Sequence, residues 1–171
     1  MKVVTKMEGL EGVLSTLKSL PPELVSKGGG PVRFAVRKAA NIIRDEAKAQ
    51  MIARGNTPGA TSKNYATGFT AKHIISKRTK LTQIKGERFV VTVRTAPHPN
   101  GNKIGKGKAI RTNDIAFIME AGSVKQPAEP WLRPAFDTKR QQAATTMEVE
   151  LKAAIDRIVK KLARQNQNQG R

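Results

Sequence analysis

The sequence predicts an α+β fold in which a small antiparallel sheet is flanked by two N-terminal helices and one long C-terminal helix. Apolar residues recur at helical spacing in three segments, 7–20, 31–53 and 130–164. Between the second and the third, the pattern changes to the two-residue period of β-strands. At 171 residues, the chain 1–171 is expected to form a single domain.

The two N-terminal helices are each bounded by proline. The first, over residues 7–20, ends at Pro21 and Pro22, because proline cannot donate the next helical hydrogen bond. The second runs from Pro31, which suits a first helical position, to about Ala53. Its predicted core-facing stripe consists of Val32, Val36, Ala39, Ala40, Ile43, Ala47 and Met51.

Two strand candidates follow and predict a hairpin. The first is residues 72–77, and the second is Arg88–Thr95, which is rich in β-branched side chains. Two segments around them, 55–71 and 96–113, are expected to be long polar or basic loops. Loops of this length are uncommon in a compact domain. The first is either an arm facing another subunit or a lumen, or a disordered segment.

The charge of the chain is concentrated in its middle. Residues 54–111 contain thirteen Lys and Arg and one acidic residue, Glu87, so they carry +12 of the net charge of +19. Such a field attracts polyanions, including nucleic acids. The candidate contacts for DNA or an acidic partner are the loop cations Lys103, Lys106, Lys108 and Arg111. The alternative is that this loop is merely solvated.

The residues that usually carry catalysis or bind metal are scarce. The chain has no Cys and only two His, and no nucleophile elbow, zinc motif or dinucleotide fingerprint is present. We therefore expect no enzymatic activity, no metal and no cofactor. The N-terminus has no apolar signal region, and no apolar run is long enough to span a bilayer, so the chain is expected to be soluble.

Residues 115–136 form the most specific stretch, with the only Trp and two of the five Phe. Residues 114–120 fit a short helix or a strand equally well, because a short apolar run does not distinguish the two periods. Pro130 marks the start of a helix that is expected to reach Arg164, with residues 165–171 as a frayed polar tail. The predicted fold or interface anchors, among which Glu120 and Arg133 are an ion-pair candidate, are Phe117, Glu120, Gly122, Pro130, Trp131, Leu132, Arg133 and Pro134.

This stretch resembles a motif of tailed-phage virion proteins. Residues 116–123 read AFIMEAGS and residues 127–135 read PAEPWLRPA. They are similar to the segments Ala-x-x-x-Glu-x-Gly-Thr and Pro-Ala-x-Pro-Phe-Leu-Arg-Pro-Ala of the head–tail joining or tail-completion proteins, the group that includes lambda's minor tail protein Z. Ser123 replaces Thr, Trp131 replaces Phe, and the basic loop before the motif is longer.

The resemblance implies a structural role in the virion, at the neck or the top of the tail, after assembly in the host cytoplasm. Its implied partners are further copies of the chain in a ring, a hexamer by analogy with tail tubes, a head completion or connector protein, and a tail terminator or tail tube protein. A tape measure protein and packaged DNA, contacted without sequence specificity, complete the set. The alternatives are a sequence-independent DNA-binding accessory protein and, less compatible with the long helix, a basic protein of the ribosome.

Overall fold

The computed structural model describes residues 30–55, 68–79, 87–99, 103–104 and 108–169. Their elements, in chain order, are α3 (Gly30–Gly55), α4 (Phe69–Lys72), β1 (Ile74–Thr79), β2 (Arg88–Val93), β3 (Lys103–Ile104), β4 (Lys108–Ala109), α5 (Thr112–Ala121) and α6 (Leu132–Gln169). The fold is α+β, as the sequence predicts. The helix expected at 7–20 and the turn around Gly86 lie outside the described residues.

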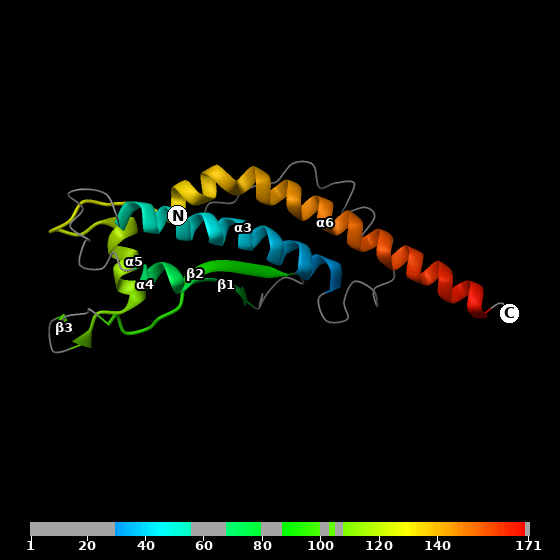
Figure 1. The fold of residues 1–171 in the computed structure, drawn as a ribbon, viewed down its shortest axis with the longest axis horizontal. Coiled ribbons are helices and arrows are strands. Elements are labelled where there is room, and N and C mark those ends of the chain that lie inside the picture. The colour runs from blue at the N-terminus through cyan, green and yellow to red at the C-terminus, as the bar shows by residue number, and fades with distance from the viewer. Residues whose placement is uncertain (1–29, 56–67, 80–86, 100–102, 105–107, 170–171) are drawn as a thin grey trace.

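The described elements form an elongated layered arrangement (Figure 1). Helices α3 and α6 lie side by side and antiparallel, the β1–β2 hairpin lies against α3, and α5 crosses one end. The C-terminal part of α6 extends beyond the end of α3. With 38 residues, α6 is about 57 Å long at the usual helical rise.

The α3–α6 pair is packed largely through small side chains. The buried apolar residues of α3 are Ala35, Ala39, Ala47 and Met51, and those of α6 are Ala135, Ala143, Leu151, Ala154 and Ile155. Small side chains allow two helix axes to approach closely. The predicted stripe did not include Ala35, which is fully buried, whereas Val32 and Ile43 are only partly buried.

The β1–β2 hairpin is antiparallel, as predicted, with Ile74 opposite Val93 and Thr79 opposite Arg88. The prediction placed the first strand two residues too early, because Phe69–Lys72 forms one helical turn before it. That turn also occupies the end of the expected loop 55–71. Within the expected loop 96–113, β3 pairs with β4, and Thr112 already belongs to α5.

The segment left open between helix and strand, 114–120, is helical. Helix α5 begins at Thr112, and the Asp114 carboxylate accepts a hydrogen bond from the Arg111 backbone N–H at 3.2 Å. An acidic side chain that reaches back to the residue before the helix stabilises its first turn. Helix α6 starts two residues after Pro130 and remains helical to Gln169, so most of the tail expected to fray is part of the helix.

Candidate functional site

The stretch between α5 and α6, which we call the hinge (residues 120–133), is built around the carboxylate of Glu120. Its Oε2 atom accepts hydrogen bonds from the backbone N–H groups of Trp131 and Leu132, both at 2.8 Å. Its Oε1 atom accepts one from the backbone N–H of Arg133 at 3.3 Å. The first N–H groups of a helix have no partner within that helix. Glu120 therefore caps α6 from a different helix, and its negative charge complements the positive end of the helix dipole.

The predicted ion pair between Glu120 and Arg133 is present. The Nε atom of Arg133 lies 3.3 Å from Oε1 of Glu120. The Arg133 side chain is 75% exposed, so the ion pair itself adds little stability compared with the backbone hydrogen bonds. Glu120 is thus a positioning group for α6. The sequence predicted the ion pair with Arg133, but it did not predict that Glu120 caps α6.

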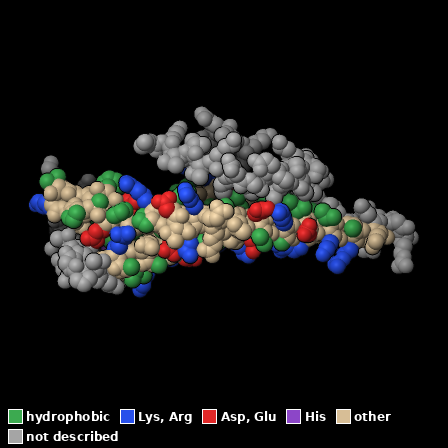
Figure 2. Space-filling model, turned by 90° about the horizontal axis from the view of Figure 1, so that it is seen from above, with side chains coloured by type: hydrophobic (Ala, Val, Ile, Leu, Met, Phe, Trp, Pro, Cys, Tyr) green, Lys and Arg blue, Asp and Glu red, His purple; other side chains and the backbone are tan. Residues whose placement is uncertain are grey.

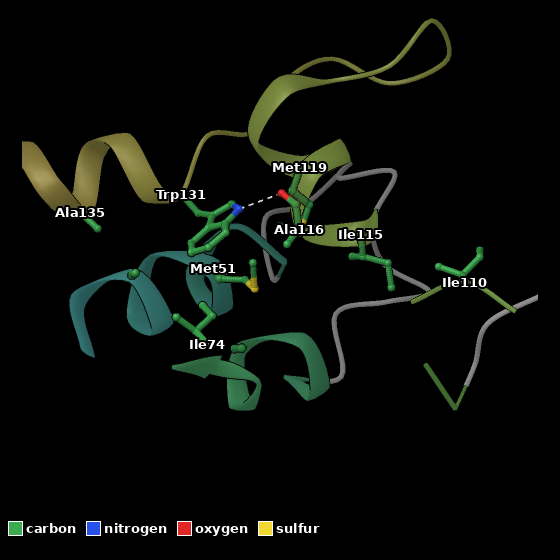
Figure 3. Packing of buried hydrophobic residues seen from close by; sticks show 10 residues of the cluster. Met51, Ile74, Ile110, Ile115, Ala116, Met119, Trp131 and Ala135 are labelled. Carbon is green, nitrogen blue, oxygen red and sulfur yellow. Dashed lines mark hydrogen bonds between the residues drawn. The ribbon is translucent and has the colours of Figure 1, made fainter. Parts of the chain in front are cut away.

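Trp131 anchors the hinge in the larger apolar cluster of the molecule (Figure 3). It is 3% exposed, and its indole Nε1–H donates a hydrogen bond to the carbonyl of Ala116 at 3.0 Å. Met51 of α3, Ile74 of β1 and Met119 of α5 belong to the same cluster. Trp131 therefore joins three elements, and its single polar atom is satisfied, as buried Trp requires.

Gly122 is required by the backbone of the hinge. It follows α5 with φ 78°, a conformation that residues with a Cβ atom rarely adopt. A Cβ atom there would lie 2.8 Å from the backbone nitrogen of Ala128. After it, Ser123 and Gln126 exchange backbone hydrogen bonds around a tight turn, at whose tip Val124 is fully exposed.

The remaining predicted anchors differ in their surroundings. Leu132 packs against the apolar cluster, and Pro130 is partly buried beside it. Pro134 lies in the first turn of α6, where a missing N–H costs no helical hydrogen bond. Phe117 is not a fold anchor, because it lies on the outer face of α5 and is 70% exposed, whereas the alternative role as an interface anchor stays a prediction. The signal that would have excluded it is helical spacing, which groups Ile115, Ala116 and Met119 on the buried face.

A second feature, which the sequence analysis missed, is a groove with a volume of about 790 Å³ between α3 and the β1–β2 hairpin. We call it the basic groove. Its lining contains seven cationic side chains and, within the described part of the chain, no carboxylate; the cations are Arg37, Arg44, Lys48, Lys72, Lys77, Arg78 and Arg94. They come from three segments that are far apart in the sequence, which is why a local charge run did not reveal them.

Two of the groove cations are neutralised locally. Arg44 makes two hydrogen bonds to Asp45, at 2.8 and 3.0 Å, and Arg78 makes two to Glu87, at 2.7 and 2.6 Å. The hydrogen bond with Glu87 raises the pKa of Arg78, so that side chain stays charged. The other five, Arg37, Lys48, Lys72, Lys77 and Arg94, form no ion pair among the described residues.

The cations that the sequence singled out lie elsewhere. Lys103 and Lys108 are on the short β3–β4 hairpin, Arg111 precedes α5 and is exposed, and Lys106 lies outside the described residues. Arg111 is not among the described residues that line the basic groove. Figure 1 shows the β3–β4 hairpin projecting at the end of the molecule where α5 lies. A role of these residues in DNA contact stays a prediction.

The surface of the molecule on the α6 side, which Figure 2 shows, has a different charge pattern from the basic groove. Figure 2 shows acidic and basic side chains interleaved on it. The ion pairs of α6 include Lys152–Glu148 along the helix and Lys38–Glu150 between α3 and α6. The described lining of the basic groove is therefore cationic, whereas the surface on the α6 side carries charges of both signs.

The two histidines form a small aromatic cluster with Phe69. The rings of Phe69 and His73 have centroids 4.4 Å apart, and those of Phe69 and His98 are 5.1 Å apart, edge to face. His98 is 4% exposed, and burial, with a smaller contribution from the charge of His73, lowers its pKa. In the described ranges, no group of three or more His, Cys, Asp or Glu is placed to hold a metal ion. No described helix is long and apolar enough to cross a membrane.

Comparisons of the chain with protein-family models, with curated protein sequences and with solved structures give no significant match. The functional conclusion therefore depends on the hinge, the basic groove and the motif in the sequence.

Proposed function

We propose that the protein is a structural component of the neck of a tailed phage. It forms a ring that joins the head connector to the tail tube, completes the tail, and presents a positively charged surface to the DNA. The proposal takes its identity from the resemblance of residues 116–123 and 127–135 to the head–tail joining and tail-completion proteins.

The observation that carries the proposal is the construction of the hinge. Three residues of the motif have specific structural roles: Glu120 caps α6, Gly122 permits the turn, and Trp131 fills the apolar cluster. Together they fix the direction in which α6 leaves α5. A motif whose residues position a long helix fits a protein that acts as a building block.

Several exposed apolar side chains are candidate contacts for assembly into a larger structure. At the hinge end, Phe117 is 70% exposed and Val124 is fully exposed. On α6, Val149 and Val159 are each at least half exposed. Apolar side chains of this size on a surface are typical of protein–protein contacts when they lie together in a patch. A ring requires two different complementary surfaces on each subunit, and an elongated subunit offers them along its length.

Light scattering combined with size-exclusion chromatography, and negative-stain electron microscopy of the purified protein, test the ring. A closed ring is expected, with six-fold symmetry by the analogy with tail tubes, and the protein is expected in purified virions. A protein that stays monomeric at high concentration and is absent from virions contradicts the proposal.

The basic groove favours a second candidate, a DNA-binding accessory protein without sequence specificity that acts outside the virion. Five cations in one groove, which form no ion pair among the described residues, are the kind of surface that binds a phosphate backbone without sequence specificity. A monomer that binds duplex DNA with sub-micromolar affinity and a steep dependence on salt, and that is missing from virions, supports this candidate in place of the neck protein.

A further inference from the structure

We infer that the basic groove between α3 and the β1–β2 hairpin is the surface that holds the phosphate backbone of duplex DNA. The identity of the ligand, duplex DNA, rests on the proposed function. The place of the site comes from the structure, and it differs from the loop at 96–113 on which the sequence analysis placed its candidate contacts.

The first argument is the amount of unpaired charge. Arg37 and Lys48 on one wall, and Lys72, Lys77 and Arg94 on the other, have no acidic partner in the described part of the chain. Two acidic residues near these cations in the sequence, Asp45 and Glu87, are already paired with Arg44 and Arg78. Glu46 is directed elsewhere, toward Lys139 of α6 and Gln50. An anion that enters the groove therefore meets no carboxylate among the described lining residues.

The second argument is the arrangement of these cations. Arg37, Arg44 and Lys48 follow one another at intervals of seven and four residues, so they lie along one face of α3. The row from Arg37 to Lys48 is about 16 Å long at the helical rise. Duplex DNA carries one charge for about every 1.7 Å along its axis. Such a row can therefore contact several phosphates of one duplex.

The third argument is what the lining lacks. The described residues of the lining include no aromatic side chain, so they offer no platform on which the bases of a single strand could stack. Its apolar residues are Ile74, Ile75 and Val93, and Ile74 is fully buried. An acidic protein partner would need apolar or aromatic anchor positions at the centre of its contact. The hydroxyl groups of Thr92 and Thr95 are instead suited to phosphate oxygens.

Fluorescence anisotropy with a labelled duplex of mixed sequence, measured over a series of salt concentrations, tests the inference. If all five unpaired cations contact phosphates, the slope of log affinity against log salt is about −4.5. The groove variant Lys48→Ala/Lys72→Ala/Arg94→Ala should reduce this slope by about 3 and the affinity near 0.1 M salt by more than about 100-fold.

The matched control is Lys160→Ala/Lys161→Ala/Arg164→Ala. It removes the same charge from exposed positions of α6 that form no ion pair among the described residues. It should leave the slope unchanged. Circular dichroism of both variants checks that they are folded. A third variant, Lys103→Ala/Lys108→Ala/Arg111→Ala, measures how much the cations of the β3–β4 loop contribute to DNA binding.

Three results would overturn the inference. The first is an equal loss in the groove variant and the α6 control, which would mean that only the net charge attracts DNA. The second is a larger loss in the loop variant than in the groove variant. The third is tighter binding of a single strand, or of poly-glutamate, than of the duplex.

Light scattering of the same samples separates this inference from the proposed function. If the protein forms a ring but binds no DNA, the basic groove is not a DNA site, and the proposed neck function is not contradicted. DNA binding that depends on Lys48, Lys72 and Arg94 in a protein that never forms a ring supports the groove and contradicts the neck function.

Discussion

The hinge end of the molecule and the distal half of the α3–α6 pair are held together in different ways. At the hinge end, directional hydrogen bonds from Glu120 and Trp131 fix α5 and α6 around an apolar cluster that contains an indole ring. In the distal half, a smaller cluster of Ala35, Leu151 and Ile155 joins the two helices. The distal half also has one directional contact between the two helices, the Lys38–Glu150 ion pair, but both side chains are partly exposed, so this pair adds little stability. We therefore expect the hinge end to be the more stable part of the described structure.

The largest expected effect is that of Trp131→Ala. It removes the largest buried side chain of the hinge cluster and should lower the free energy of unfolding by about 4 kcal/mol. Urea denaturation measures the loss. It should also disrupt virion assembly more than any substitution in residues 103–108. The control is Phe117→Ala, an aromatic truncation at a 70% exposed position, which should leave the stability nearly unchanged. Equal losses in the two variants would contradict the role of Trp131.

Leu151→Ala tests the distal half. Leu151 is 6% exposed in the smaller cluster, and its truncation should lower the free energy of unfolding by about 2.5 kcal/mol. Hydrogen exchange should show faster exchange in the distal part of α3 and α6, with the hinge end still protected. The control Val149→Ala, at a 58% exposed position, should have little effect. Equal deprotection at both ends would mean that the two regions unfold as one unit.

Two substitutions of Glu120 separate the effect of its negative charge from the effect of its hydrogen bonds on stability. Glu120→Ala removes the cap of α6 and should lower the free energy of unfolding by about 2 kcal/mol. Glu120→Gln keeps an acceptor oxygen but loses the charge, so about half of that loss is expected. Asp156→Ala, which removes an exposed carboxylate from the same helix, is the control. If Glu120→Ala costs no more than Asp156→Ala, the cap does not position α6.

The smallest expected effect is the pH dependence that His98 gives to the hinge end. Its folded-state pKa is lowered, first by burial and then by His73, so the unfolded chain binds a proton more readily. The contribution of His98 to stability is therefore full above the ordinary His pKa of about 6.5 and is lost as the pH falls through the lower folded value. His98→Gln should reduce the slope of stability against pH below neutrality. An imidazole titration by NMR with a midpoint at or above the ordinary value would contradict this.

Local patterns in the sequence were sufficient for the two long helices and for the β1–β2 hairpin. The periodicity of residues 31–53 and 130–164, and the β-branched run from Arg88, predict elements that the structure contains, with shifted ends. The Glu120–Arg133 pair and the anchoring role of Trp131 also followed from residue type and proximity to the helix start. Helical and strand periods reflect which side chains one element buries, and that information is local.

The tertiary structure alone decided the features that join distant segments. It made 114–120 a helix, because the hinge cluster accepts Ile115, Ala116 and Met119 on one helical face. It placed the Glu120 carboxylate on the first turn of α6. It also brought the cations of α3, β1 and the end of β2 to one basic groove. Charges and hydrogen bonds act through space, so their partners are set by the packing of elements and not by spacing along the chain.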